Sequence, residues 1–344
     1  MANRRSLDEG RPTDIDTGGF MLRLSILDLA TVGPEESYAE ALAGSVALAQ
    51  AAEEAGYTRI WYAEHHNHAS IASSATAVLI AHVASATESI RLGAGGIMLP
   101  NHSPLVIAEQ FGTLETLHPG RIDLGLGRAP GTDTTTVRAL RRDLGAAANF
   151  PDDVLELQAY LGNETRVPGV NAYPGMGTNV PLYILGSSLF GAKLAAALSL
   201  PYAFASHFAP NALQQAIAAY RSEFVPTQRQ PEPYVIAGAN VIAADSEEEA
   251  QEELTRVKRS RVSLILKPGT TYTDEQADFL LASPQGHHIQ QMMTYTAVGT
   301  GEEAKDYLEG FAKETGADEI MVTHPGSTAE NRIRSATLLA QAAL

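Results

Sequence analysis

The most restrictive feature of this sequence is a regular alternation of short apolar runs with longer, alanine-rich stretches. The apolar runs are the expected strands, at 23–27, 59–63, 90–98, 122–126, 182–185, 203–206, 234–243 and 319–323. Stretches of helical periodicity between them are the expected helices, among them 37–55, 74–87, 104–117 and 210–224. Strands and helices that alternate in this way are typical of βαβ units and a parallel sheet.

The strand count and a missing motif separate a closed barrel from an open sheet. An open doubly wound sheet that binds a dinucleotide carries G-x-G-x-x-G after its first strand. Here that position reads LDLATVGPEES, which lacks the motif. Eight strand–helix units without it predict an α/β fold, the (β/α)8 TIM barrel. The intervals 127–181 and 245–318 are too long for single crossovers, which predicts insertions after strands 4 and 7. The second insertion is the expected cover of the barrel mouth.

Composition and charge exclude several classes of function. The absence of cysteine excludes disulfides, thiolate metal sites, iron–sulfur clusters and a cysteine nucleophile. The formal net charge of −16 argues against a nucleic-acid partner. No apolar run reaches the ~18 residues that a membrane span requires. Residues 1–20 are polar and lack the apolar segment of a signal peptide, so we expect a disordered tail before a single domain at 21–344, in the cytoplasm.

Polar residues gather where the expected strands end. In a TIM barrel the catalytic residues lie at the carboxyl ends of the strands. Six of the ten histidines follow expected strands: His65, His66, His68, His102, His207 and His324. This concentration indicates an enzyme.

The run Glu64-His65-His66-Asn67-His68 supports three interpretations. His66 and His68 form an H-x-H pair that could hold the metal of a barrel hydrolase, although the last strand ends in histidine and not in the aspartate usual for such enzymes. Glu64 and the histidines could instead hydrogen-bond one another and close the barrel mouth. They could also perform acid–base chemistry beside a cofactor.

A second group of residues has the character of an anion site. Gly186-Ser187-Ser188 ends one strand and opens a helix, where free amides, hydroxyls and the helix dipole favour a phosphate. A simple helix cap is the alternative. Arg128, at another strand end, and Arg138, a little further on, favour the anion.

Gly95-Gly96 interrupts the expected strand at 90–98. Adjacent glycines weaken a strand unless a bulge or a close ligand needs the missing side chains. A bulge and a flat ligand pressed against the backbone are equally compatible with the sequence.

Three stretches resemble one family of enzymes. They are AEEAGYTRIWYAEHHN at 52–67, IRLGAGGIMLPNHSPLVIAEQFGTLETLHPGRIDLGLGR at 90–128 and AVGTGEEAKDYLEGFAKETGADEIMV at 297–322. The chain resembles the bacterial luciferase-like flavin-dependent monooxygenases. The resemblance implies a barrel, commonly dimeric, that binds FMN at its carboxyl face. Such enzymes use reduced FMN and O2, through a C4a-peroxyflavin, to oxygenate a small organic substrate, in luciferases a long-chain aldehyde.

The resemblance also implies roles for individual residues. Glu64 and His65 correspond to residues beside the isoalloxazine, and His65 to the catalytic histidine. Gly95-Gly96 corresponds to the pair behind the ring, where the family often has a cis peptide. The phosphate site corresponds to Arg128, Arg138 and the segment 186–188.

Two departures from the family pattern bear on function. Gly127 stands where luciferase α chains carry a reactive cysteine, which argues against efficient light emission. Gly186 replaces the glutamate that precedes the phosphate-binding serine. Because no nicotinamide fingerprint is present, reduced FMN is expected from a separate NAD(P)H:flavin reductase.

The sequence thus predicts a homodimeric, cytoplasmic, FMN-dependent monooxygenase with no metal in its site. A metal-dependent barrel hydrolase built on His66 and His68 and a flavin-binding protein without turnover are the alternatives.

Overall fold

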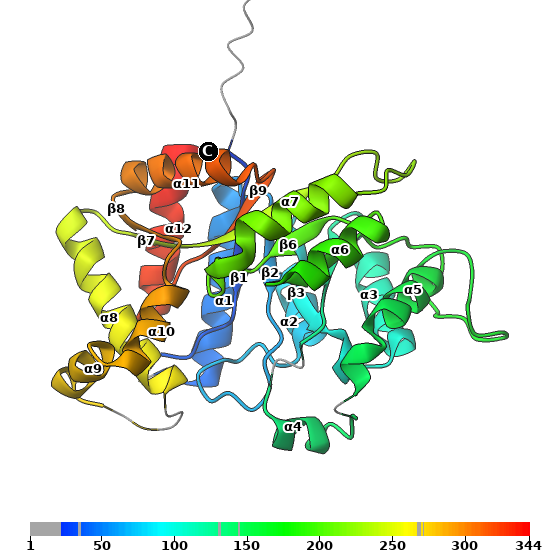
Figure 1. Ribbon diagram of the computed structural model, residues 1–344, viewed down its shortest axis with the longest axis horizontal. Coiled ribbons are helices and arrows are strands. Elements are labelled where there is room, and N and C mark those ends of the chain that lie inside the picture. Colours follow the sequence, from blue (N-terminus) through cyan, green and yellow to red (C-terminus); the bar gives the residue numbers. More distant parts are fainter. Residues whose placement is uncertain (1–21, 34–35, 130–131, 144, 267–269, 271) are drawn as a thin grey trace, which may run out of the picture.

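The computed structural model describes residues 22–33, 36–129, 132–143, 145–266, 270 and 272–344. The predicted tail at 1–20 lies outside them. The strands are β1 (Leu24–Asp28), β2 (Arg59–Tyr62), β3 (Arg91–Met98), β4 (Ile122–Gly127), β5 (Leu182–Gly186), β6 (Tyr202–Phe204), β7 (Val235–Ala243), β8 (Thr296–Gly299) and β9 (Glu319–Thr323). β1 to β7 pair in sequence order, and β9 closes the ring between β7 and β1. All these pairings are parallel, which confirms the (β/α)8 barrel (Figure 1).

The eight predicted strands form the barrel as β1 to β7 and β9, and a further strand, β8, lies within the second long interval. β7 is nine residues long, and β6 pairs only with its first part, Val235–Ala237. The remaining length, Asn240–Ala243, pairs with β8. The sequence of β8, TAVG, is too short to be recognised as a strand.

Helices cover the barrel and fill both predicted insertions. The covering helices are α1 (Tyr38–Glu54), α2 (Thr76–Ala84), α3 (Pro104–Leu117), α5 (Phe150–Leu161), α6 (Leu189–Ala197), α7 (Leu213–Glu223), α11 (Gly301–Thr315) and α12 (Ala329–Ala343). The insertions add α4 (Thr134–Ala139) after β4, and α8 (Glu247–Ile265), α9 (Asp274–Leu281) and α10 (Pro284–Met292) after β7. Short 3-10 helices are η1 (Leu99–Asn101), η2 (Ala146–Ala148) and η3 (Pro210–Ala212). In Figure 1, α4, α9 and α10 lie toward the lower edge, away from the C-terminus.

Local sequence signals explain where several helices begin. Ser37 opens α1 with a capping box, in which Glu40 binds back to the amide of Ser37. Thr300 and Glu303 form the same arrangement at α11. Each capping box satisfies two amides that a helix start otherwise leaves unpaired.

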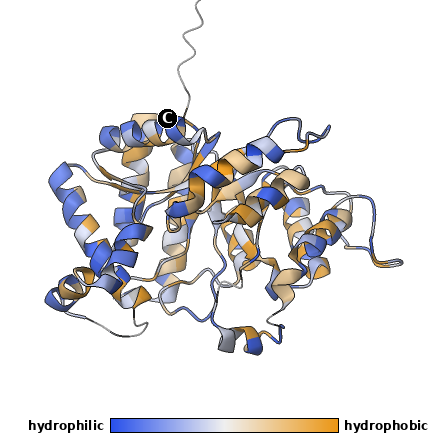
Figure 2. Ribbon diagram, in the orientation of Figure 1, coloured by the Kyte–Doolittle hydropathy of each residue, from blue (hydrophilic) through white to orange (hydrophobic). Residues whose placement is uncertain are grey.

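The insertion after β7 is held by small apolar clusters of its own. Figure 2 shows α8 as largely hydrophilic, in contrast to the barrel strands. Val257 of α8 packs with Ile242 and Met293, and Val262 packs with residues of α9 and α10. Among the described residues, no helix combines the length and the apolar character needed to cross a membrane.

A buried ionic network fills the amino end of the barrel. Arg59, the first residue of β2, donates to Asp123 of β4 at 2.7 Å and to Glu319 of β9 at 3.2 Å. Arg91 also pairs with Asp123, and Tyr234 donates to Glu319 at 2.7 Å. These charges join the strands far from their carboxyl ends, so we assign them to the stability of the barrel.

Candidate functional site

Glu64 organises the carboxyl end of β2 and β3. Its buried carboxylate accepts hydrogen bonds from Nε2 of His66 at 2.7 Å, from Nε2 of His102 at 2.8 Å and from the amide of Met98 at 3.0 Å. Burial alone would raise the pKa of Glu64, but these hydrogen bonds outweigh it and lower the pKa to about 2. Glu64 is therefore a fixed negative charge that orients two imidazoles from different loops.

The pKa of His66 provides a test of this arrangement. The hydrogen bond to Glu64 raises the pKa of His66 above its usual 6.5. We expect Glu64→Gln to return that pKa toward 6.5, measured by NMR titration of the ring, while Glu330→Gln leaves it unchanged. A raised His66 pKa that persists in Glu64→Gln would contradict the assignment.

The same two pKa shifts set the pH range over which the pair stabilises the fold. The pKa of Glu64 is lowered on folding. Its contribution to the free energy of unfolding is therefore present above the usual pKa of 4.5 and is lost as the pH falls toward 2. The pKa of His66 is raised on folding, so its contribution is present below 6.5 and is lost as the pH rises through the folded value.

The predicted H-x-H metal pair is not brought together. His66 turns to Glu64, whereas Nδ1 of His68 lies 3.2 Å from Oγ of Ser70. Among the described residues, the group with metal-ligand spacing is Glu64, His66 and His102, whose ligand atoms lie within 4.8 Å of one another. Both Nε2 atoms in that group already donate to one carboxylate oxygen, so its hydrogen bonds account for the arrangement without an ion. The interpretation in which Glu64 and histidines hydrogen-bond one another is confirmed for His66 and His102.

His65 and His207 each have a ring nitrogen without a hydrogen-bond partner. Within the described part of the chain, Nδ1 of both rings is buried and unpaired, as is Nε2 of His324. Burial, and then the charge of His68, lower the pKa of His65 below 6.5. Burial, Arg261 and His65 lower the pKa of His207 to about 3. Both rings are therefore neutral at pH 7.

Two other residues at strand ends, Asp28 and His324, have structural partners. Asp28 accepts hydrogen bonds from Ser45 at 2.5 Å and from the amide of Ala30 at 2.9 Å. Nδ1 of His324 lies 2.8 Å from Oγ of Ser335 on α12. One ring nitrogen of His324 is therefore held by α12, while its Nε2 is buried without a hydrogen-bond partner among the described residues.

The segment 186–188 forms an uncapped helix start. Ser188 occupies the cap position of α6, yet its side chain makes no capping hydrogen bond. The capping alternative is therefore wrong for Ser188. The guanidinium of Arg128 stacks on the ring of Phe190 at 3.9 Å, which holds a cation beside the first turn of α6. Unpaired amides and an adjacent arginine together suit an anion.

Arg138 is exposed on α4 and makes no described contact with Arg128 or Ser187. Phe190 was missed by the sequence analysis. Its only signal was its position in the helix that opens after Ser188, which does not reveal that an arginine stacks on it.

The glycine pair on β3 is explained by packing in the barrel wall. The Gly95–Gly96 peptide is cis, and the β3–β4 register shifts between Ala94 and Ile97, which supports the bulge, one of the two explanations that the sequence left open. A Cβ on Gly96 would lie 2.6 Å from the carbonyl oxygen of Gly125. The two strands come too close there for a side chain.

Gly127, the position of the luciferase cysteine, is also closely packed. A Cβ there would lie 2.8 Å from Sδ of Met98. A cysteine at this position would require the methionine to move.

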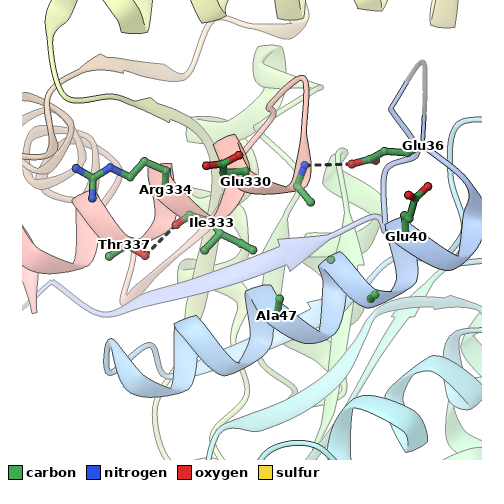
Figure 3. A pocket seen from close by; sticks show the side chains of 10 residues that line it. Glu36, Glu40, Ala47, Glu330, Ile333, Arg334 and Thr337 are labelled. Carbon is green, nitrogen blue, oxygen red and sulfur yellow. Dashed lines mark hydrogen bonds between the residues drawn. The ribbon is translucent and has the colours of Figure 1, made fainter.

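A shallow groove on the outside of the barrel, between α1 and α12, is a separate feature (Figure 3). Its acidic side chains have structural roles, since Glu36 accepts from the amide of Ala329 at 3.3 Å and Glu40 caps α1. Its polar groups therefore hold helix ends and do not form a second reactive cluster.

Comparison with known proteins identifies the family. The family model "Luciferase-like monooxygenase" matches residues 22–319. A luciferase-like monooxygenase of Escherichia coli K12 is 47% identical over 88% of this chain and 91% of its own. An N-acetyl-S-alkylcysteine monooxygenase of Bacillus subtilis is 33% identical over 94% of this chain and 99% of its own.

Solved structures agree with the fold. The crystal structure of apo-MsnO8 superposes with a TM-score of 0.78 at 33% identity, over 93% of this chain and 98% of its own. The oxygenating constituent of 3,6-diketocamphane monooxygenase from Pseudomonas putida, in complex with FMN, superposes with a TM-score of 0.68 at 14% identity. The match covers 94% of this chain and 98% of its own. An F420-dependent secondary alcohol dehydrogenase superposes with a TM-score of 0.67 at 15% identity, over 94% of this chain and 99% of its own. The family model matches most of the chain, and the Escherichia coli relative is 47% identical. The protein therefore belongs to the luciferase-like monooxygenase family.

Proposed function

We propose that this protein is an FMN-dependent monooxygenase that uses reduced FMN and O2 to oxygenate a small organic substrate. The observation that carries the proposal is the anion site at the start of α6, where Arg128 stacks on Phe190 beside an uncapped helix end. A phosphate-bearing cofactor anchored there would extend over the barrel mouth. The monooxygenases among the relatives and neighbours, one of them solved with FMN, support the same choice.

The residues of the mouth fit such a cofactor. The unused Nδ1 atoms of His65 and His207 offer buried polar contacts. The backbone of Gly95 is partly exposed, while Leu27 and Trp61 occupy the space that a side chain there would need. In this proposal Gly95-Gly96 lies against the isoalloxazine ring of FMN, and Arg128 and the segment 186–188 hold the FMN phosphate. Arg138 remains a prediction from the resemblance, with no described contact in its support.

Each residue then has a defined task in the reaction. Reduced FMN supplies the electrons that activate O2. His65, neutral at pH 7, accepts a proton at its free nitrogen. Glu64 holds His66 and His102 in place and keeps a negative charge beside them. The apolar barrel and the insertion after β7 limit the access of water to the site.

The phosphate assignment predicts a selective loss of affinity. We expect Arg128→Ala to weaken FMN binding about 10- to 100-fold and to leave riboflavin binding nearly unchanged, because only FMN carries the phosphate. Fluorescence titration of both flavins measures the effect, with the exposed Arg229→Ala as the control. Equal losses for FMN and riboflavin would refute the assignment.

The activity itself is tested by anaerobic loading with chemically reduced FMN, mixing with 18O2, and a screen of aldehydes, ketones and thioethers. We expect one 18O atom in the product and one in water. Reduced F420 in place of FMN tests the cofactor used by the alcohol dehydrogenase neighbour. Flavin bound without any oxygenated product would favour a flavin carrier over the enzyme.

Three further features remain predictions that accompany this proposal. They are a separate reductase that supplies reduced FMN, a homodimeric assembly and a cytoplasmic location.

A further inference from the structure

Arg261, on α8, is a partly buried cation without a counter-ion among the described residues. Its Nη2 donates to Oδ1 of Asn240 at 3.2 Å. Its Nη1 is buried and has no hydrogen-bond partner, and no carboxylate pairs with it within the residues that the structure describes. Burial lowers the pKa of Arg261 to about 10. An unpaired guanidinium in such a place is costly to the fold, which indicates a role in binding.

Its neighbours on the same helix differ from it. Arg256 pairs with Glu253 at 2.8 Å, and Arg259 pairs with Asp278 at 2.6 Å. Acidic side chains are thus plentiful along α8, and Arg261 is placed where none of them reaches it.

Asn240 fixes Arg261 at the carboxyl end of the barrel. Its amide nitrogen donates to the carbonyl oxygen of His207 at 2.8 Å, and its Oδ1 also accepts from Thr323 at 2.9 Å. Arg261 is therefore tied to the ends of β6, β7 and β9. Arg261 and the backbone carbonyl of His207 therefore share one partner, the side chain of Asn240.

We propose that Arg261 is the counter-ion of an anionic head group, a carboxylate or a sulfonate, on the substrate. The inference rests on the proposed function, since it assumes that the mouth between His65 and His207 is the reaction site. The planar fork of a guanidinium matches both head groups. The flavin phosphate has its own site at β4 and β5, which leaves this cation for the substrate. Asn240 orients the guanidinium, so that its free Nη1 can donate to the head group.

The test compares charged and neutral probes of one length on the FMN-loaded enzyme. Hexanoate, hexane-1-sulfonate and hexanamide are titrated by calorimetry into the native protein and the variants Arg261→Gln, Arg261→Lys and Lys258→Gln. We expect the native protein to prefer both anions to the amide. Arg261→Gln should weaken the anions about 10- to 100-fold and leave the amide unchanged. Arg261→Lys should retain part of the affinity for the anions. Lys258→Gln, which removes a charge from the same helix, should retain all of it.

Four results would overturn the proposal. They are no anion preference in the native protein, unchanged anion binding in Arg261→Gln, an equal loss for hexanamide, and a loss of FMN affinity in Arg261→Gln. The last would assign Arg261 to the flavin. If the native protein does not bind FMN, the proposed function fails, and the same titrations on the flavin-free protein still decide whether Arg261 holds an anion.

Discussion

Replacing Arg59 with methionine is expected to lower the free energy of unfolding by about 3–5 kcal/mol. Arg59 is 6% exposed and joins Asp123 and Glu319 at the amino end of the barrel. Its removal leaves Glu319 a buried carboxylate whose remaining hydrogen bonds come from the hydroxyls of Ser25 and Tyr234. A buried charge that loses its partner costs far more than a surface pair contributes. Urea denaturation measures the loss.

The half-exposed pair between Arg221 and Asp318 provides a matched control. Arg221→Met should cost less than about 1 kcal/mol. Adding Glu319→Gln to Arg59→Met should recover part of the stability, because it removes the stranded charge. If both arginine variants lose the same small amount, the network does not hold the barrel as described.

Replacing His65 with alanine is expected to slow oxygenation about 10²- to 10⁴-fold and to leave FMN affinity nearly unchanged. His65 has a buried, unpartnered Nδ1, and burial lowers its pKa below 6.5. The neutral ring is therefore the main form at pH 7 and can take up a proton. Single-turnover kinetics with reduced FMN and O2 measure the rate, and fluorescence titration measures the affinity.

The pH profile separates proton transfer from a structural role for His65. In the native enzyme the rate should fall as the pH drops through the lowered pKa of His65, because the ring becomes protonated. In His65→Ala this fall should disappear. His82→Ala, on the exposed face of α2, should retain the native profile. A His65→Ala variant that loses flavin but turns over normally in the residual complex would contradict the assigned role.

The barrel was predictable because its strands are largely apolar and its helices repeat between them. α3 begins and ends at the predicted residues, since Pro104 and Leu117 bound a clear helical period. β8 was not predictable, because its four residues depend on the spare length of β7 for their pairing. Tertiary pairing, and not local propensity, determines that strand.

The site was predictable where residues follow directly on a strand. Glu64 and the serines of 186–188 lie where the pattern of strand ends places them. The same pattern placed His324 after β9, but a strand end alone does not show that Nδ1 of this ring contacts Ser335. Arg261 was missed because nothing in the sequence of α8 distinguishes it from Arg256 and Arg259, which have carboxylate partners.

A crystal structure of the protein soaked with FMN tests the central claim most directly. The account predicts the phosphate within hydrogen-bond distance of Arg128 and the first amides of α6, with the ring against Gly95-Gly96 and near His65. An empty mouth, a flavin phosphate bound elsewhere, or a metal ion on Glu64, His66 and His102 in place of the flavin would contradict it.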